Sequence, residues 1–314
     1  MGIKTKLSLQ EINSILQSYD IGKCVDFSIF KTGVVHSNYK IVTTKGTFVL
    51  RIFERRTKQE IMIEMQTLKI LEKDFLYAPN IIYTKQKKSL VDYKNKLVGI
   101  FSYLKGKHID AKKATPEQIY SLGKRVAEMH TILEHQKFAA IKHKAALNKK
   151  EAKHILNLVL KDNPNFPHRI KRHLDKSISL VQFKNYSQGI VHGDLHGENI
   201  LFKGKNLSGI VDFDDAFYGN QILDLGCIIG YFCIRKKIAY DLCKALLQGY
   251  EEIRPLKNIE KTYLYDTTLL FMTIHTMYWY WSPKLWDTDV HAFKTIQILL
   301  KTNRETFSKN IFQV

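Results

Sequence analysis

The sequence predicts an α+β fold of two lobes, the first rich in strands and the second mainly helical. The chain has 314 residues, more than a single hydrophobic core usually holds. Short runs rich in residues of high β-propensity recur through the first hundred positions, around one or two helices, whereas helical periodicity dominates after Gly106. We expect the boundary at residues 104–106, which gives lobes of residues 1–104 and 105–314.

Helices and strands alternate in the first lobe. Ser8 and Glu11 form the Ser-x-x-Glu pattern of a capping box, which predicts a helix to about Gln17. An amphipathic helix is expected over residues 57–75, where apolar residues recur at spacings of 4, 3 and 3. The expected strands are residues 24–30, 39–43, 47–53 and the two arms of a hairpin at 91–103.

The second lobe begins with a clear signal for a helix start. Thr115 is a suitable N-cap and Pro116 suits the first helical position, so a helix is expected to about Leu133. A basic helical region follows at residues 142–176, broken by the Asn-Pro-Asn-Phe-Pro segment at 163–167.

Composition narrows the class of protein. Lysine and arginine number 49 against 30 acidic residues, a net charge of +19, which favours polyanions nonspecifically. No nucleic-acid-binding motif accompanies this charge, so we expect a solvated basic surface and no specific nucleic-acid partner. The four cysteines form no metal-ligand array. No signal peptide is evident in the sequence. The longest apolar run, near residues 225–234, is too short to span a membrane. We therefore expect a cytoplasmic protein without a membrane anchor.

One segment carries most of the functional information. Residues 189–202 place apolar residues on both sides of a polar loop, with His192, Asp194 and Asn199 in the order His-x-Asp-x-x-x-x-Asn. This is the spacing of the kinase catalytic loop. Asp194 is therefore expected to act as the catalytic base towards a substrate hydroxyl, and Asn199 to bind Mg²⁺.

A second segment with strand character, residues 209–215, contains Asp212. It lies 18 positions after Asp194 (212 minus 194), a distance that permits a hairpin to bring the two carboxylates to one site. Because Mg²⁺ prefers hard oxygen ligands and takes some from phosphate, Asp212 and Asn199 suffice as protein ligands. Alone, the two segments also fit a common turn, a surface acidic knuckle or a calcium site. Together they favour an enzyme that uses ATP and Mg²⁺.

These motifs resemble those of the aminoglycoside phosphotransferase and choline kinase superfamily, whose members share the two-lobed protein-kinase-like fold. The resemblance implies a small antiparallel sheet in the first lobe, ATP between the lobes and direct transfer of phosphate to an alcohol. His-Gly-Asp-Leu-His at 192–196 and Asp-Phe-Asp at 212–214 differ from the His-Arg-Asp and Asp-Phe-Gly of protein kinases, and no Ala-Pro-Glu motif follows. A small-molecule alcohol is therefore the expected substrate.

Within this superfamily, residues 19–39, 47–55 and 249–256 are similar to type II homoserine kinase. This likeness implies phosphorylation of the homoserine side chain in threonine biosynthesis, although Asp-Phe-Asp-Asp-Ala at 212–216 resembles other branches. Kinases of the same fold that act on choline, methylthioribose or an aminoglycoside are the first alternative. A noncatalytic pseudokinase or a basic nucleic-acid-binding module is the second. The oligomeric state is left open.

Five further residues are candidates for nucleotide binding. Gly33 lies where kinases cover the phosphates with a glycine-rich loop, and the resemblance implies that Ser37 and Asn38 donate to phosphate. A plain hairpin turn is the alternative. Ser102 and Leu104 lie at the lobe boundary, where the backbone is expected to bind adenine.

A kinase also needs a cation near the phosphates, usually a strand lysine paired with a helix glutamate. Arg51 occupies the expected strand position, and its arginine fork clamps two oxygens where lysine acts as a point charge. Glu64 is the expected partner and Glu60 the competitor, while a solvated surface arginine is the alternative.

Asp224 and the aromatic residues 278–281 have two interpretations each. Asp224 is either a brace for the catalytic loop or a helix N-cap. The aromatic residues 278–281 line an acceptor pocket or belong to the core, and His275 is expected to be a core histidine. The candidates to face the acceptor are His196, Asp214 and Asp215.

Overall fold

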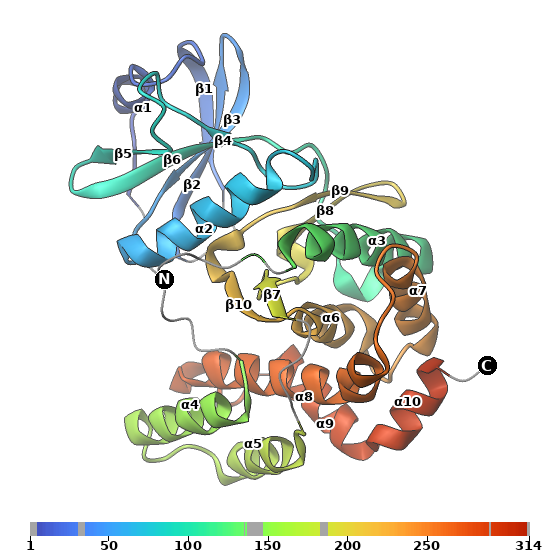
Figure 1. Ribbon diagram of the computed structural model, residues 1–314. Helices are drawn as coiled ribbons and strands as arrows, with labels where there is room; N and C mark the ends of the chain where they lie inside the picture. The colour runs from blue at the N-terminus through green and yellow to red at the C-terminus, as the bar shows by residue number, and fades with distance from the viewer. Residues whose placement is uncertain are drawn as a thin grey trace. The chain divides into compact units, whose positions relative to one another are not determined.

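The computed structural model describes residues 5–30, 35–134, 136, 147–182, 188–288 and 290–312, which form two compact units (Figure 1). Unit 1 comprises Met1–Gly106 and Ser208–Asp214, and unit 2 comprises Lys107–Leu207 and Asp215–Val314. The lobe boundary expected at residue 104 differs from the observed division mainly because the later segment Ser208–Asp214 also belongs to unit 1. Ile210 N donates to Tyr77 O at 2.7 Å there, a long-range contact that local patterns do not encode.

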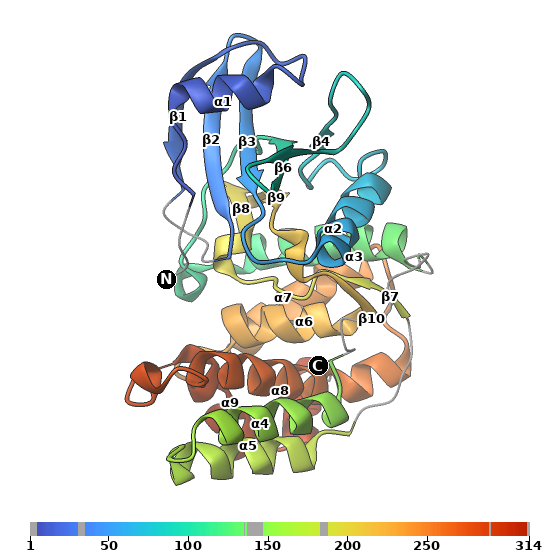
Figure 2. The same cartoon turned by 90° about the vertical axis from the view of Figure 1, so that its left-hand side faces the viewer.

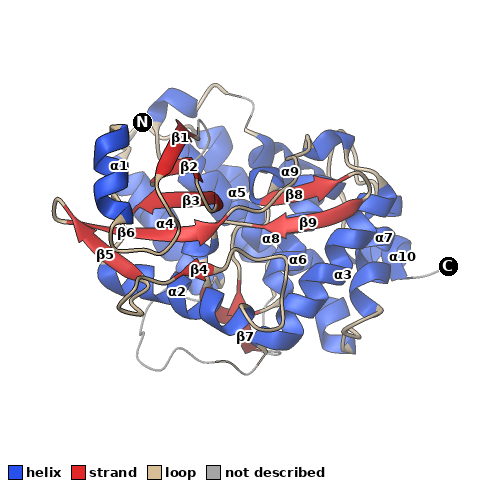
Figure 3. Cartoon of the chain, turned by 90° about the horizontal axis from the view of Figure 1, so that it is seen from above, coloured by secondary structure: helices blue, strands red, loops and turns tan. Residues whose placement is uncertain are grey.

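Unit 1 contains an antiparallel sheet in the order β1-β2-β3-β6-β4, with β5 paired to β6 (Figure 3). Its strands are β1 (Cys24–Ile29), β2 (Ser37–Thr43), β3 (Gly46–Ile52), β4 (Ile81–Ile82), β5 (Leu90–Tyr93) and β6 (Lys96–Ser102). The expected strands and hairpin are confirmed. Lys94 and Asn95 form the tight turn of the hairpin with φ of 49° and 61°, the left-handed conformation that two-residue hairpins use.

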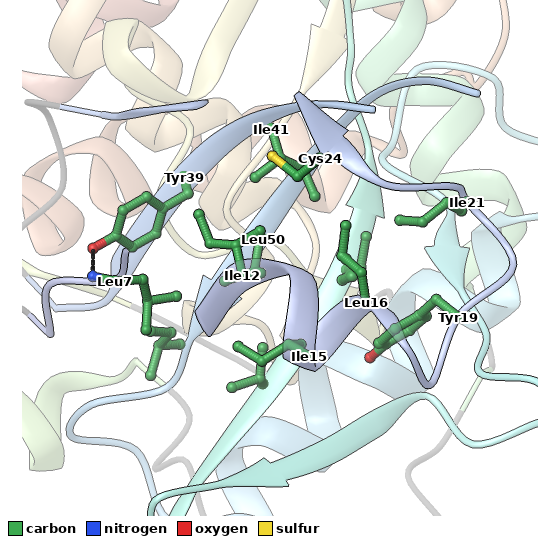
Figure 4. Close-up of a cluster of buried hydrophobic side chains, with 13 residues drawn as sticks. Leu7, Ile12, Ile15, Leu16, Tyr19, Ile21, Cys24, Tyr39, Ile41 and Leu50 are labelled. Carbon is green, nitrogen blue, oxygen red and sulfur yellow. Dashed lines mark hydrogen bonds between the residues drawn. The ribbon is translucent and has the colours of Figure 1, made fainter. Parts of the chain in front are cut away.

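Helix α1 (Leu9–Leu16) covers one face of this sheet and begins at the predicted capping box of Ser8 and Glu11. The tyrosine hydroxyl of Tyr39 accepts a hydrogen bond from Leu7 N at 3.0 Å, which ties the start of the chain to β2 (Figure 4). The apolar cluster beneath the helix contains Leu7, Ile12, Ile15, Leu16, Tyr19, Ile21, Cys24, Tyr39, Ile41, Leu50, Ile52, Val98 and Ile100. Burial of these side chains holds helix and sheet together.

Successive side chains of β3 point to opposite faces of the sheet. Leu50 and Ile52 belong to the cluster beneath α1, so Arg51 points to the opposite face. Helix α2 (Lys58–Leu71) lies on that side, where its Glu64 contacts Arg51. The sheet therefore separates an apolar face from a face that carries a buried ion pair.

Unit 2 is mainly helical, as predicted (Figure 2). Its helices are η1 (Ala111–Lys113), α3 (Pro116–Leu133), α4 (Lys149–Asp162), α5 (His168–Leu180), η2 (Gly197–Asn199), α6 (Ile222–Ile228), the π-helical turn η4 (Ile229–Cys233), α7 (Tyr240–Glu251), α8 (Asn258–Tyr280), η5 (Pro283–Leu285), α9 (His291–Lys301) and α10 (Arg304–Phe312). Strand β7 (Gln188–Val191) pairs with β10 (Phe217–Asn220), and β8 (Ile200–Lys203) pairs with β9 (Asn206–Ile210), which is followed by η3 (Phe213–Asp215).

The helices of unit 2 pack around the central helix α8 and through a close approach of α3 and α7. Helix α8 is buried over most of its length and touches α4, α5, α6, α9 and α10. Helices α3 and α7 approach through Gly123 and Gly249, where an added Cβ would lie 2.1 Å from Leu246 O and Tyr120 O respectively. Only glycine permits this separation, because any larger side chain would meet the backbone of the other helix.

Several helix predictions are confirmed and one interpretation is wrong. Helix α3 begins at the expected Thr115 cap, and the proline-containing segment separates α4 from α5. The view of residues 278–281 as core holds for Tyr280, which is buried, but fails for Tyr278 and Trp279, which are 56% and 54% exposed. None of the described helices is both long and apolar enough to cross a membrane.

Candidate active site

The loop that the sequence predicts to be catalytic, residues 192–199 and called the catalytic loop below, follows β7 in unit 2 and ends with η2. Strand β7 pairs with β10 as far as Val191 opposite Phe217, and the chain then turns at Gly193 with φ of 84°. A Cβ at this position would lie 2.6 Å from Asp215 O. Both the backbone conformation and the close approach therefore require glycine.

Two side chains of the same loop hold Asp194. Asn199 Nδ2 donates to Asp194 O at 2.8 Å and to Asp194 Oδ2 at 2.9 Å, and His196 Nε2 lies 3.2 Å from the same Oδ2. Among the described residues, none donates a hydrogen bond to Oδ1 of Asp194. The carboxylate is thus fixed through Oδ2, and its Oδ1 is available to accept a hydrogen bond.

Asp194 is ionised at neutral pH. Burial alone would raise the pKa of this carboxyl, but the hydrogen bond from His196 and the charges of His196, His275 and His192 lower it below its ordinary value. An ionised carboxylate with an available oxygen accepts a hydrogen bond from an alcohol.

Asp224 on α6 braces the catalytic loop, as one of its two interpretations predicted. Its Oδ2 accepts from His192 N at 2.8 Å and its Oδ1 accepts from Gly193 N at 2.9 Å. His130 Nε2 on α3 lies 3.0 Å from Oδ2. Asp224 and His130 are fully buried, so these contacts occur without competition from water.

The brace continues away from the loop through a row of buried polar groups. Tyr250 on α7 lies with its hydroxyl 2.8 Å from His130 Nδ1 and 3.1 Å from Arg254 Nη1. Arg254 Nη2 in turn donates to Glu260 Oε1 at 3.0 Å. Burial lowers the pKa of His130 despite the opposing hydrogen bond with Asp224, so the imidazole is neutral. It donates from Nε2 to Asp224 and accepts at Nδ1 from the Tyr250 hydroxyl.

Four rings, called the ring group, lie beside the catalytic loop in unit 2: His196, Tyr231, His275 and His291. Tyr231 is the central member. Its ring centroid is 5.6 Å from those of His196 and His291, and its hydroxyl is 2.8 Å from His275 Nδ1. The prediction that His275 is a core histidine is therefore incomplete, because it is only half-buried and hydrogen-bonded to this group.

Arg51 is the centre of a separate polar cluster in unit 1. Its Nη1 donates to Glu64 Oε1 at 2.7 Å, its Nη2 lies 3.0 Å from Asp212 Oδ1, and its Nε donates to Asn38 Oδ1 at 2.9 Å. The strand register explains part of this geometry, since Asn38 and Gly99 are the cross-strand neighbours of Arg51 on β2 and β6. Burial raises the pKa of Glu64, and the charge of Arg51 opposes this rise.

The competitor Glu60 has a different role. It caps α2, where its Oε2 accepts from Thr57 N at 2.8 Å, and its Oε1 lies 3.4 Å from Arg56 Nη1. Glu64, one turn later, is the residue that reaches Arg51.

The segment after β9 brings two acidic residues into the same unit. Asp212 has a φ of 69°, an uncommon conformation for a residue with a side chain that often marks functional sites. Asp214 Oδ2 lies 3.2 Å from His36 Nε2 and 3.1 Å from Arg56 Nη2. Burial would raise the pKa of Asp214, but the hydrogen bond with His36 and the charges of Arg56 and Arg51 lower it strongly.

The remaining nucleotide candidates have mixed surroundings. Gly33 lies outside the described residues. Ser37 is buried, accepts from Thr5 N at 3.0 Å and donates to Glu54 Oε1 at 2.6 Å, so its hydroxyl is already engaged. The hydroxyl of Ser102 accepts from Asn80 N at 2.9 Å, while Leu104 is half-buried.

Sequence patterns did not reveal the residues that contact and position Asp194, Asp224 and the ring group. Tyr250 and Arg254 lie in the third stretch that resembles homoserine kinase, a signal that identified the stretch but not its contact with the loop. His130 and Tyr231 lie in helical patterns where nothing distinguishes a polar contact from ordinary packing. Their roles follow from distances between helices rather than from spacing along the chain.

Comparisons with known sequences extend these observations. The phosphotransferase enzyme family matches residues 26–256 of the chain. The homoserine kinase of Brucella anthropi is 27% identical over 267 residues, covering 83% of this chain and 80% of that protein. The homoserine kinase of Parvibaculum lavamentivorans is 26% identical over 266 residues, covering 83% and 81%.

Solved structures share the fold. The amicoumacin kinase hAmiN, in complex with AMP-PNP, Ca²⁺ and Ami, aligns over 95% of both chains with a TM-score of 0.70 and 14% identity. Choline kinase from Cryptosporidium parvum Iowa II aligns over 97% of this chain and 98% of that chain with a TM-score of 0.67 and 15% identity. These likenesses confirm the expected kinase-like fold. Because the matching family extends over well more than half of the sequence, the chain belongs to the phosphotransferase enzyme family.

Proposed function

We propose that the chain is a homoserine kinase, which transfers the γ-phosphoryl group of ATP to the side-chain hydroxyl of L-homoserine and releases ADP and O-phospho-L-homoserine. The observation that carries the chemistry is Asp194, an ionised carboxylate fixed through Oδ2 by Asn199 and His196. The homoserine kinases at 25–27% identity over 83% of the chain support the choice of acceptor.

Asp194 acts as the base in this proposal. Its available oxygen accepts the proton of the acceptor hydroxyl and orients the hydroxyl oxygen towards the γ-phosphorus. Transfer is direct, so the P–O bond to the acceptor forms as the bond to ADP breaks and no covalent enzyme intermediate is needed. Alignment and neutralisation of charge supply most of the acceleration in reactions of this class.

Arg51 is proposed to bind the α- and β-phosphates of ATP. Three acceptors hold its guanidinium, from Glu64, Asp212 and Asn38, so its orientation is set before the nucleotide binds. A preorganised cation costs little reorganisation when phosphate binds. Asn38 thus positions Arg51, a role that differs from its expected direct contact with phosphate.

Mg²⁺ is the proposed metal, and the donor chemistry of the predicted ligands fits it. Asn199 directs its amide nitrogen to Asp194, which leaves Oδ1 as a hard oxygen that accepts no hydrogen bond from the described residues. Asp212 supplies a carboxylate in a conformation that its backbone fixes. When bound, Mg²⁺ neutralises charge on the phosphates, and water and phosphate complete its oxygen ligands.

The test is an ADP-release assay with Mg²⁺ and ATP across L-homoserine, choline, methylthioribose and an aminoglycoside, with the product identified by mass. We expect the highest kcat/KM for L-homoserine and no turnover by Asp194→Ala. Turnover of another alcohol without turnover of homoserine would support a phosphotransferase activity but contradict homoserine as the acceptor. No turnover of any alcohol, with ATP still bound, would favour the noncatalytic alternative.

A further inference from the structure

Asp214 is a buried carboxylate two residues after the proposed Mg²⁺ ligand Asp212, and three nitrogen atoms approach one of its oxygens. His36 Nε2 lies 3.2 Å from Asp214 Oδ2, and Arg56 Nε and Nη2 lie 3.3 Å and 3.1 Å from the same atom. All of these residues belong to unit 1. Asp214 and His36 are only 8% and 3% exposed, so water competes little for these contacts. Asp214 is thus held by two residues that lie far from it in the sequence.

The surroundings of His36 determine both the orientation of its ring and the position of its proton. Glu54 N donates to His36 Nδ1 at 3.3 Å, and an imidazole nitrogen that accepts a hydrogen bond carries no proton. The ring proton therefore lies on Nε2, the nitrogen beside Asp214. Phe53 packs edge-on against the ring, with 5.1 Å between the centroids. His36 is thus an N–H donor towards Asp214.

Arg56 is oriented by the start of α2. Its Nη1 lies 3.4 Å from Glu60 Oε1, and Glu60 is itself fixed because it caps the helix at Thr57. The opposite side of the guanidinium, Nε and Nη2, contacts Asp214. A planar guanidinium held in this way makes a directional contact, unlike the point charge of an ammonium group.

The segment that carries Asp212 is anchored on both sides. Before it, Ile210 N donates to Tyr77 O at 2.7 Å, and after it Asp214 is held by the contacts described above. Between these anchors Asp212 adopts the left-handed φ of 69°. Such a conformation is unfavourable for a residue with a side chain and persists where the surrounding structure enforces it. The contacts of Asp214 therefore bear directly on the conformation of Asp212.

We infer that His36 and Arg56 are positioning residues, which hold Asp214 and thereby fix the conformation in which Asp212 binds Mg²⁺. This rests on the Mg²⁺–nucleotide part of the proposed function and is independent of which alcohol accepts the phosphate. Asp214 in this view anchors the segment and is not itself a Mg²⁺ ligand. The role also differs from the acceptor-facing one for which the sequence made Asp214 a candidate.

The test measures how strongly Mg²⁺ tightens the binding of AMP-PNP, an ATP analogue, by calorimetry with and without the metal. The Mg²⁺ effect is the Kd without Mg²⁺ divided by the Kd with Mg²⁺. His36→Phe keeps an aromatic ring against Phe53 but removes the donor. We expect the Mg²⁺ effect to fall by about 10- to 100-fold, the range for loss of a residue that supports a metal ligand. The Kd without Mg²⁺ should stay close to that of the wild type.

Conservative variants separate positioning from a loss of packing. His36→Gln places an N–H near the position of Nε2, so it should recover part of the Mg²⁺ effect that His36→Phe loses. Arg56→Lys keeps a charge beside Asp214 and should likewise exceed Arg56→Met. His173→Phe is the matched control, because His173 on α5 in unit 2 also packs edge-on against a phenylalanine, Phe293, at 5.3 Å. It should match the wild type.

Asp214→Asn separates an anchor from a metal ligand. The amide oxygen still accepts from His36 and Arg56, so this variant should retain much more of the Mg²⁺ effect than Asp212→Asn. A loss as large as that of Asp212→Asn would mean that Asp214 binds the metal itself, and the inference would be wrong.

The remaining outcomes distinguish the inference from the proposed function. If His36→Phe and Arg56→Met keep the wild-type Mg²⁺ effect, or weaken binding equally with and without Mg²⁺, the inference is wrong and the proposed function stands. If the wild type shows the Mg²⁺ effect but does not phosphorylate homoserine, the proposed acceptor fails, while the same variants still decide the inference. Absence of any Mg²⁺ effect in the wild type would overturn the inference together with the assignment of Asp212 as a ligand.

Discussion

The hydroxyl of Tyr250 lies 2.8 Å from Nδ1 of His130, although the two residues are 120 positions apart in the sequence. This contact joins α7 to α3 and continues through Asp224 to the backbone of His192. The loop that carries the proposed base is therefore supported by a row of donors and acceptors, each satisfied by the next.

Tyr250→Phe tests this support. The substitution removes the hydroxyl between His130 and Arg254, so His130 Nδ1 and Arg254 Nη1 each lose this buried hydrogen bond. We expect a loss of about 1–3 kcal/mol in the free energy of unfolding, measured by urea denaturation, and a fall in kcat that exceeds any change in KM. Tyr120→Phe is the control, because the Tyr120 hydroxyl bonds to Glu252 near the surface. Equal effects of the two variants would show that Tyr250 contributes only packing.

Asp194→Asn should separate turnover from nucleotide binding. The amide keeps the shape of the side chain but cannot accept the hydroxyl proton, so kcat should fall about 10²- to 10⁴-fold. The Kd for ATP, measured by calorimetry, should stay within about threefold because the carboxylate acts on the acceptor. Asp175→Asn, an exposed residue of α5 paired with Lys171, should change neither quantity. Near-normal turnover by Asp194→Asn would remove the assignment of the base.

Arg51→Lys should weaken ATP binding although the charge is kept. One ammonium cannot serve Glu64, Asp212 and Asn38 in the geometry of the guanidinium fork. We expect the KM for ATP to rise by about tenfold and the unfolding free energy to fall by about 1–3 kcal/mol, since buried acceptors lose partners. Arg125→Lys, in a partly exposed pair with Glu128, provides the matched control. An unchanged KM for ATP would argue that Arg51 has only a structural role.

Asp212→Asn and Asp212→Ala form an informative pair. Asparagine tolerates the positive φ of 69° that Asp212 adopts, whereas alanine adds a strain of about 1 kcal/mol. Both variants should lose Mg²⁺-dependent nucleotide binding, but only Asp212→Ala should also unfold more easily. Calorimetry with and without Mg²⁺ measures the first effect, and thermal unfolding measures the second. Full Mg²⁺-dependent binding by Asp212→Asn would contradict its role as a ligand.

The pKa of His275 predicts how stability depends on pH. Burial lowers this pKa from 6.5 to about 4 in the folded protein, so the unfolded chain binds more protons between these values and stability falls as the pH falls through this window. Asp194, Asp215 and His196 face the same ring and modulate the effect. Between pH 7 and pH 5, the wild-type protein should therefore lose stability relative to His275→Gln. Parallel stability curves for the two proteins would show that His275 titrates normally.

The sequence determined the features that depend on local spacing. The capping patterns of Ser8 and Thr115 predicted where α1 and α3 begin, because capping depends on residues within one turn. Alternation predicted β3 and placed Arg51 on it. The order of Asp194 and Asn199 along one short loop predicted a shared site, and the structure joins them by a hydrogen bond at 2.9 Å.

Only the tertiary structure decided which distant groups meet. Glu64 rather than Glu60 reaches Arg51 because the position of α2 against β3 selects the helix face, and no local pattern encodes that position. In the same way, Tyr231 contacts His275 and Tyr250 contacts His130 because helices far apart in the chain pack side by side. Spacing along a sequence fixes contacts within one turn or one hairpin, whereas contacts between elements depend on how the whole core packs.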